Sequence, residues 1–101
     1  MLEWRSAMNL LIVDDEYLVV EEVVTVTDWE LLGITEIYSA TNAVSAVRIL
    51  NEKKIDIMIC DIEMPQTDGL ELSKKAKENF PDLEIVMLTS HAEFNYVRNA
   101  L

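Results

Sequence analysis

The sequence predicts an α/β protein with a doubly wound parallel sheet of strand order 2-1-3-4. Short apolar runs, typical of strands buried on both faces, alternate with segments that read as helices. Strands that alternate with helices imply right-handed crossovers and a parallel sheet that is covered on both faces. Acidic residues also end the first and third apolar runs, where neighbouring strands of such a sheet would meet.

The first strand is predicted at residues 9–13, which are wholly apolar after Asn9. Residues 16–27 follow, with Glu21 and Glu22 among many valines. Valine disfavours a helix only weakly, and the length and position of the segment favour one. We therefore predict a helix there.

A loop is predicted from Thr27 and Asp28 to Gly33, and a second strand at residues 34–40. Thr41 and Asn42 are suited to cap the helix that follows, which we predict to run to about residue 51 because its apolar residues recur at helical spacing.

The third strand is predicted at residues 55–60, and residues 64–69 are predicted to be a loop because they combine a proline with an Asp-Gly pair. A helix is expected at residues 70–79, which Pro81 ends. Residues 83–88 read as the fourth strand, and residues 93–101 begin a further helix.

Length and charge restrict the function. A chain of 101 residues is at most one domain, and its 50% hydrophobic content makes disorder unlikely. Its net charge of -11 repels phosphate backbones, so we expect no binding to nucleic acid. Such a surface suits a bound cation or a cationic partner.

The sequence predicts a cytoplasmic protein. Its one cysteine, Cys60, lies in an apolar run, cannot form an internal disulfide and is expected in the core. No apolar run approaches the ~20 residues of a membrane span. Residues 1–7 contain no signal peptide and are expected to be an expression remnant or an upstream start, with the domain at residues 8–101.

The residues that could carry chemistry lie at the ends of the predicted strands. Asp14 and Asp15 follow the first strand, Asp61 follows the third, and Thr89 follows the fourth. Carboxylates in apolar surroundings need a cation or hydrogen bonds to compensate them. Oxygen ligands suit Mg²⁺ (or Mn²⁺). A zinc site built from His and Cys ligands is implausible, because the sequence has only one His and one Cys. Asp61 could then attack a phosphoryl group, and the Thr89 hydroxyl could donate a hydrogen bond to it.

Plainer interpretations stay open for each of these residues. Asp14 and Asp15 could form a solvated turn, Asp61 could be a cap, and Thr89 could be an ordinary strand residue. His91 is a loop histidine that could be exposed and inactive. Three methionines are expected to pack in the core or in loops rather than to bind a cofactor: Met58, Met64 and Met87.

The motifs together resemble the receiver domain of bacterial two-component response regulators. They are Val13-Asp14-Asp15-Glu16, Asp61-Ile62-Glu63-Met64-Pro65 with Asp68-Gly69, and Leu88-Thr89-Ser90. The resemblance runs from about residue 9 to 101. Two further stretches look like receivers fused to AraC-type helix-turn-helix output domains: Asp28-Trp29-Glu30 before Gly33-Ile34, and His91 with Glu93-Phe94 and Tyr96.

This resemblance implies a flavodoxin-like fold and a role for each residue. Asp61 matches the phosphoacceptor, which also binds the metal; Asp15 matches the direct metal ligand and Asp14 the ligand that acts partly through water. The backbone carbonyl of Glu63 matches the third protein ligand, and Thr89 matches the switch hydroxyl. The Glu63 side chain and His91 occupy the positions that tune hydrolysis of the acyl phosphate.

The resemblance also implies partners. The phosphoryl group would come from a phosphohistidine on a sensor histidine kinase, and a C-terminal output domain would regulate transcription. The chain would be a switch rather than an enzyme, with slow self-dephosphorylation at most.

One departure from the family concerns the end of the chain. Receivers have a fifth strand that carries a lysine and an aromatic residue, and a fifth helix. This sequence stops within the predicted fourth helix and has no lysine after Lys77. We therefore expect an incomplete receiver domain that could self-associate through the unpaired edge of the fourth strand.

Two other functions remain as alternatives. The first is a Mg²⁺-dependent phosphohydrolase with an Asp nucleophile, although enzymes of the haloacid-dehalogenase type place D-x-D after their first strand. Here adjacent Asp14 and Asp15 follow that strand, and the presumed nucleophile lies on the third. The second is a receiver-like interaction module that is never phosphorylated.

Overall fold

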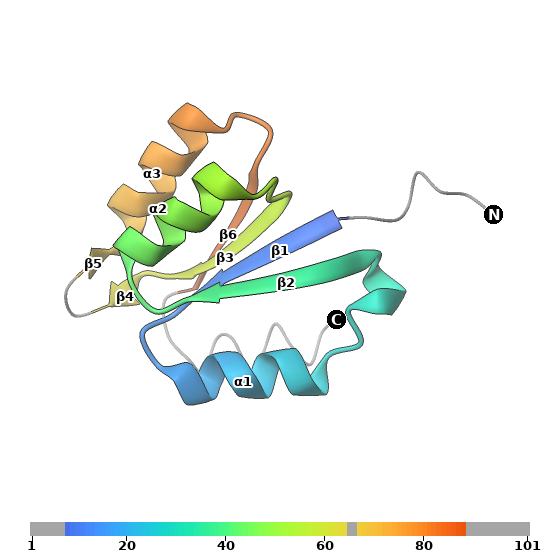
Figure 1. Cartoon of the computed structure of the whole chain (residues 1–101). Coiled ribbons are helices and arrows are strands. Elements are labelled where there is room, and N and C mark those ends of the chain that lie inside the picture. Colours follow the sequence, from blue (N-terminus) through green and yellow to red (C-terminus); the bar gives the residue numbers. More distant parts are fainter. Residues whose placement is uncertain (1–7, 65–66, 89–101) are drawn as a thin grey trace.

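The computed structural model describes residues 8–64 and 67–88 of the chain (Figure 1). Its elements follow one another in this order: β1 (Met8–Val13), α1 (Tyr17–Val26), the 3-10 helix η2 (Glu30–Leu32), β2 (Ile34–Ala40), α2 (Ala43–Glu52), β3 (Ile57–Asp61), β4 (Glu63–Met64), β5 (Thr67–Asp68), α3 (Gly69–Asn79) and β6 (Glu84–Leu88). The helix predicted at residues 93–101 lies outside the described residues. None of the described helices is long and apolar enough to cross a membrane.

Four of the strands form one sheet in the order β2-β1-β3-β6, and all neighbours in it are parallel. This is the predicted order 2-1-3-4, because β6 is the fourth strand of the main sheet. The first strand therefore lies between the second and the third, which confirms the predicted α/β class and the doubly wound topology.

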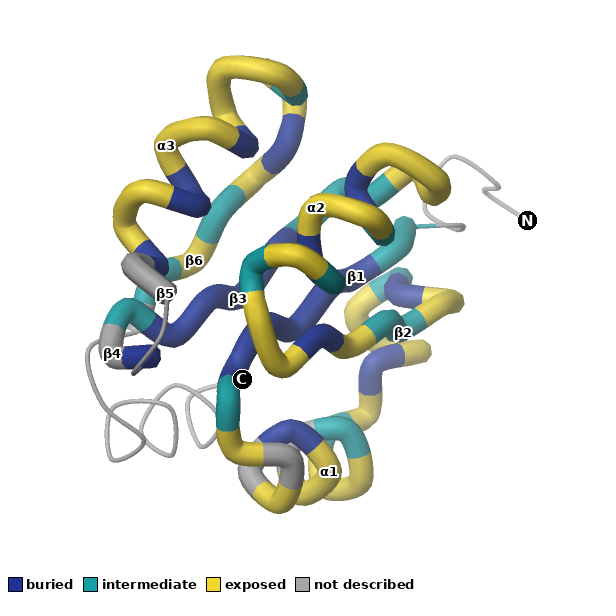
Figure 2. The backbone as a smooth tube through the Cα atoms, turned by 60° about the vertical axis from the view of Figure 1, so that its left-hand side comes forward, coloured by how far each residue is buried: buried dark blue, intermediate teal, exposed yellow. Residues whose placement is uncertain are grey.

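Helices cover both faces of this sheet (Figure 1). Leu10 and Ile12 of β1 pack in one apolar cluster with Val20 of α1. The intervening residues, Leu11 and Val13, belong to a second cluster on the opposite face, which receives Ala46 and Leu50 of α2 and Leu72 and Ala76 of α3. Alternate residues of a strand point to opposite faces, so β1 is apolar throughout because it serves two cores. Figure 2 shows this buried centre beneath helices whose outer surfaces are exposed.

The predicted cap of α2 is confirmed. Asn42 lies at its N-cap, and the Asn42 Oδ1 atom accepts a hydrogen bond of 2.8 Å from the Ser45 backbone N–H. This bond satisfies one of the backbone donors that the first turn of a helix leaves without an intrahelical acceptor.

The predicted loops were wrong in two places. Residues 64–69 were expected to be irregular, but β4 and β5 form a short antiparallel ladder in which Glu63 pairs with Asp68. Met64, which is buried, anchors this ladder, a packing effect that turn-forming residues do not reveal. Within the loop predicted before β2, η2 forms and ends at Gly33, whose φ of 82° is the left-handed conformation that glycine adopts without strain.

The register of β1 against β3 is held at the end of the sheet opposite the acidic residues. The Asp56 carboxylate accepts a 2.7 Å hydrogen bond from the Asn9 backbone N–H, and the Asn9 side-chain amide donates to the Lys54 carbonyl at 2.6 Å. The Asp56 backbone N–H in turn donates to the Asn9 carbonyl at 2.9 Å. A slip of one residue would reverse the faces of the strand, so these bonds help to decide which side chains meet at the other end.

We expect Asp56→Ala to lower the free energy of unfolding by about 1–2 kcal/mol, because it leaves the Asn9 N–H without its charged acceptor. Urea denaturation followed by circular dichroism measures the change. Asp82→Ala is the control, since Asp82 is exposed and follows α3 in a turn. Equal stability of the two variants would show that the Asp56 carboxylate does not hold the register.

Candidate metal centre

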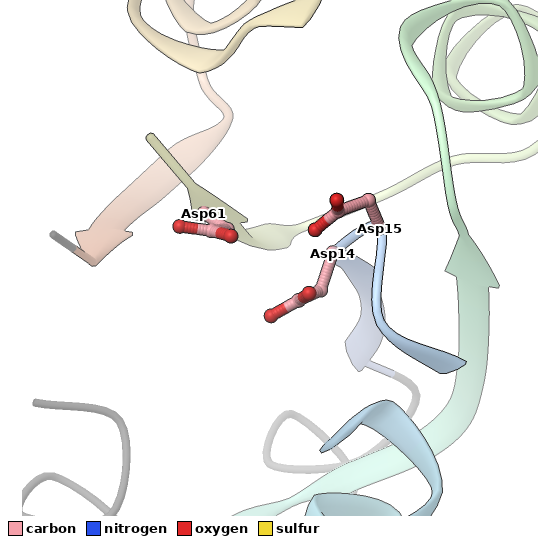
Figure 3. A group of neighbouring side chains, drawn as sticks. All are labelled: Asp14, Asp15 and Asp61. Atoms are coloured by element: carbon pink, nitrogen blue, oxygen red, sulfur yellow. The ribbon is translucent and has the colours of Figure 1, made fainter. Parts of the chain in front are cut away.

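Three carboxylates gather at the carboxyl edge of the sheet. Asp14 and Asp15 follow β1, and Asp61 is the last residue of β3. Each offers one carboxylate oxygen, and these oxygens lie within 4.8 Å of one another. Figure 3 shows the side chains extending from two neighbouring strand ends toward a common space. The structure therefore brings together residues 46 and 47 positions apart in the sequence, as the topology predicted.

The sheet register produces this meeting. Val13 pairs with Ala40 on one side and with Cys60 on the other. The next residues along β1 and β3 are Asp14 and Asp61, so both carboxylates leave the sheet at the same edge. Leu88 of β6 pairs with Asp61, which places the third strand end beside them.

The cluster is buried. Asp14 is only 1% exposed and Asp61 only 4%, while Asp15 is partly exposed. Like charges at this separation in a poorly solvated place repel. A bound cation is the compensation that carboxylates in such a place call for.

The residues present fit a hard divalent cation. All three offer oxygen, the ligand type that Mg²⁺ and Mn²⁺ prefer. Oxygen atoms around a Mg²⁺ ion are roughly 3–4 Å apart, because each lies at about 2.1 Å from the metal. The observed spacing is close to that range, so the three carboxylates could hold such an ion, with water molecules as its remaining ligands.

The backbone at the end of β1 keeps Asp14 in place. Its carboxylate Oδ1 accepts a 2.8 Å hydrogen bond from the Glu16 backbone N–H, which closes a turn between β1 and α1. The Asp14 N–H continues the sheet ladder by donating to the Ala40 carbonyl at 3.1 Å. One residue thus ends the strand and begins the turn that presents Asp15.

Cys60 lies beneath the cluster and has no exposed surface. Burial raises the pKa of its thiol to about 11, and the nearby Asp61 and Asp14 add to the increase although a hydrogen bond with Ser73 opposes it. The burial of Cys60 confirms the core role predicted for it, and the three residues that could hold a cation all offer oxygen.

Gly69 is a residue whose role the sequence did not reveal. It was predicted to belong to a turn pair, but it is buried and is the first residue of α3. A Cβ atom at this position would overlap the Asp61 carbonyl oxygen and lie 2.9 Å from the Ile62 Cα. Gly69 is needed because the start of α3 touches the backbone of Asp61 directly. Only the tertiary contact shows this.

The other predicted site residues are only partly described. Glu63 begins β4, two residues after Asp61, and only its backbone is described. Thr89 and His91 lie outside the described residues, although Leu88, which precedes Thr89, pairs with Asp61.

Comparison with known families identifies this arrangement. The family model of the response regulator receiver domain matches residues 10–101. The chain belongs to this family. The match covers both strand ends that carry the acidic residues, so the resemblance found in the motifs is confirmed over nearly the whole chain.

Curated relatives of this receiver domain include transcriptional regulators. The uncharacterized transcriptional regulatory protein YesN of Bacillus subtilis is 34% identical over 93 residues, which are 92% of this chain and 25% of YesN. YhcZ of the same organism, also described as an uncharacterized transcriptional regulatory protein, is 34% identical over 98 residues, or 93% of this chain and 44% of YhcZ. The receiver domain thus spans less than half the length of either relative.

Solved structures agree with this assignment. A two component transcriptional regulator AraC from Clostridium phytofermentans superposes with a TM-score of 0.78 at 26% identity, over 91% of this chain and 74% of that one. The REC domain of AraT, a response regulator from Geobacillus stearothermophilus, superposes with a TM-score of 0.76 at 29% identity. This match covers 92% of this chain and 72% of the AraT chain. The flavodoxin-like fold implied by the motifs is confirmed.

We expect Gly69→Ala to destabilise the receiver domain by about 1–3 kcal/mol and to weaken Mg²⁺ binding, because the added methyl group displaces the Asp61 backbone. Thermal unfolding and a calorimetric Mg²⁺ titration measure the two effects. Lys74→Ala, on the exposed side of α3, is the control and should change neither. A Gly69→Ala protein that binds Mg²⁺ like the parent would contradict the contact.

Proposed function

We propose that this receiver domain accepts a phosphoryl group on Asp61 with the help of Mg²⁺ or Mn²⁺. The observation that carries the proposal is the position of Asp61, buried at a strand end within 4.8 Å of Asp14 and Asp15. A receiver domain in a two-component pathway takes its phosphoryl group from a histidine kinase, and Asp61 is the residue here that matches the acceptor.

The chemistry assigned to Asp61 is a nucleophilic substitution. A carboxylate oxygen of Asp61 forms a bond to phosphorus while the bond from phosphorus to the donor nitrogen breaks, and the donor histidine takes up a proton. A bound divalent cation supplies positive charge where negative charge develops on the transferring oxygens. Burial of Asp61 limits the access of water to the acyl phosphate.

The remaining residues receive the roles of the positions that they match. Asp15 is proposed as the direct metal ligand, Asp14 as the ligand that acts partly through water, and the Glu63 backbone carbonyl as the third. Thr89 is proposed as the switch hydroxyl. The Glu63 side chain and His91 are proposed to tune hydrolysis of the acyl phosphate. Partial exposure of Asp15, against the nearly complete burial of Asp14, supports the division between the two carboxylates.

The partners are also proposals. A sensor histidine kinase would be the donor, and an AraC-type or other DNA-binding output domain would respond, since YesN and YhcZ are described as transcriptional regulatory proteins. The absence of nucleic-acid binding by this segment and a cytoplasmic location stay predictions. Self-association through the outer edge of β6 also stays one; in the described part of the chain β6 pairs with β3 alone.

We expect incubation with acetyl phosphate and Mg²⁺ to add one phosphoryl group to the chain, because acetyl phosphate is a small donor that needs no kinase surface. Intact-mass spectrometry detects the product. Asp61→Asn, which is nearly isosteric and lacks the nucleophilic oxygen, is the matched control and should gain nothing. Removal of the cation with EDTA should abolish the gain in the parent chain.

Other outcomes would favour the alternatives. Repeated turnover of a small phosphate ester would indicate a phosphohydrolase rather than a switch. A chain that binds Mg²⁺ but is never phosphorylated, even by a kinase phosphohistidine, would indicate an interaction module. Phosphorylation that persists in Asp61→Asn would overturn the choice of acceptor.

The metal assignment predicts unequal effects of two conservative substitutions. Asp15→Asn should weaken Mg²⁺ binding by about tenfold, equivalent to about 1.4 kcal/mol, because it removes the charged ligand. Glu63→Gln should leave the affinity nearly unchanged, since only the Glu63 carbonyl is expected to bind the metal. Calorimetric titration compares the two, and a larger loss in Glu63→Gln would contradict the assignment.

A further inference from the structure

Ser73 is a polar residue on the buried face of α3, where its neighbours on the helix are Leu72 and Ala76. The residue is 8% exposed, and its hydroxyl donates a hydrogen bond of 2.8 Å to the Met87 sulfur of β6. A thioether sulfur is a weak acceptor, so this bond compensates the buried hydroxyl only in part. Alanine would suit the apolar surroundings better, which makes the presence of a hydroxyl informative.

The strand partner of Met87 is Cys60, the residue that precedes Asp61. The Cys60 thiol donates to the carbonyl of Asp61 at 3.6 Å and, more weakly, to that of Gly69 at 4.0 Å. The Ser73 hydroxyl is therefore bonded to the strand partner of Cys60, whose thiol bonds to the Asp61 backbone.

The strand register makes this a compact bridge. Met87 pairs directly with Cys60, and Leu88 pairs with Asp61. Ser73 follows Gly69 by one helical turn, so both lie on the same face of α3. Because the start of α3 touches the Asp61 backbone at Gly69, a shift of Asp61 moves the helix that carries Ser73 relative to Met87.

We propose that Ser73 is a positioning residue that couples the acidic cluster to the end of β6. Its hydroxyl joins α3 to Met87 of β6, and the start of α3 touches the Asp61 backbone at Gly69. A change at Asp61 therefore moves α3 together with the Ser73 hydroxyl, and Met87 carries that change to Leu88. The proposal rests on the proposed function, in which the state of Asp61 changes.

The test follows the methionine methyl groups by nuclear magnetic resonance after ¹³C labelling. The chain has five methionines, and the Met87 signal is assigned from its loss in Met87→Leu. The signals are recorded with no cation, with Mg²⁺, and with Mg²⁺ plus acetyl phosphate. We expect the Met87 signal to shift with each addition in the parent chain. In Ser73→Ala that shift should be lost, although mass spectrometry still detects phosphorylation.

Controls separate coupling from a general loss of structure. Met58 is fully buried on β3, and its methyl signal should respond alike in the parent chain and in Ser73→Ala. Ser73→Thr keeps the hydroxyl and should restore the Met87 shift. Met87→Leu keeps the side-chain volume and removes the acceptor; the Leu88 amide signal then replaces the methyl signal and should lose its response.

The outcomes distinguish the two proposals. A Met87 shift with Mg²⁺ that depends on Ser73, in a chain that is never phosphorylated, supports the coupling and refutes the phosphoacceptor function. Phosphorylation of Asp61 with an identical Met87 shift in the parent chain and in Ser73→Ala overturns the coupling. A Met87 signal that ignores both Mg²⁺ and phosphorylation overturns it as well.

Discussion

The parallel pairing of β1 with β3 is the constraint on which the rest of the structure depends. Val13 and Cys60 form its last pair, so the next residues of the two strands, Asp14 and Asp61, leave the sheet side by side. A strand register cannot shift gradually; a slip of one residue would turn Asp61 toward the other face. The apolar character of β1, which is buried on both faces, and the Asp56 carboxylate at the opposite end both act to hold this register.

The acidic cluster illustrates how a stable fold supports an unfavourable charge distribution. Burial of Asp14 and Asp61 close to each other costs free energy, and the cores on the two faces of the sheet offset that cost. A cation that binds the folded chain but not the unfolded chain would stabilise the fold further. The site is therefore suited to respond to a cation and to a change of charge on Asp61.

Helix α3 links this site to the far strand. Its first residue, Gly69, contacts the Asp61 backbone because glycine has no side chain, and Ser73 one turn later bonds to Met87 of β6. The sequence predicted the helix from its apolar spacing and Pro81. It did not predict these contacts, because a small residue within a turn motif and a serine within a helix have no distinctive periodicity. The ladder of β4 and β5 was missed for a related reason, since its two-residue strands are too short to show alternation.

The sequence by itself determined the alternation of strands and helices, the strand order and the acidic residues at the strand ends, because these depend on local apolar patterns and on topological rules for parallel sheets. The motifs also pointed to the receiver family. Only the tertiary structure decided which groups surround Asp61. The contact of Gly69 with its backbone, the buried thiol of Cys60 beside it and the bridge from Ser73 to Met87 join residues on separate elements. Such distances depend on how closely helix and sheet pack, and packing is a property of the folded chain as a whole.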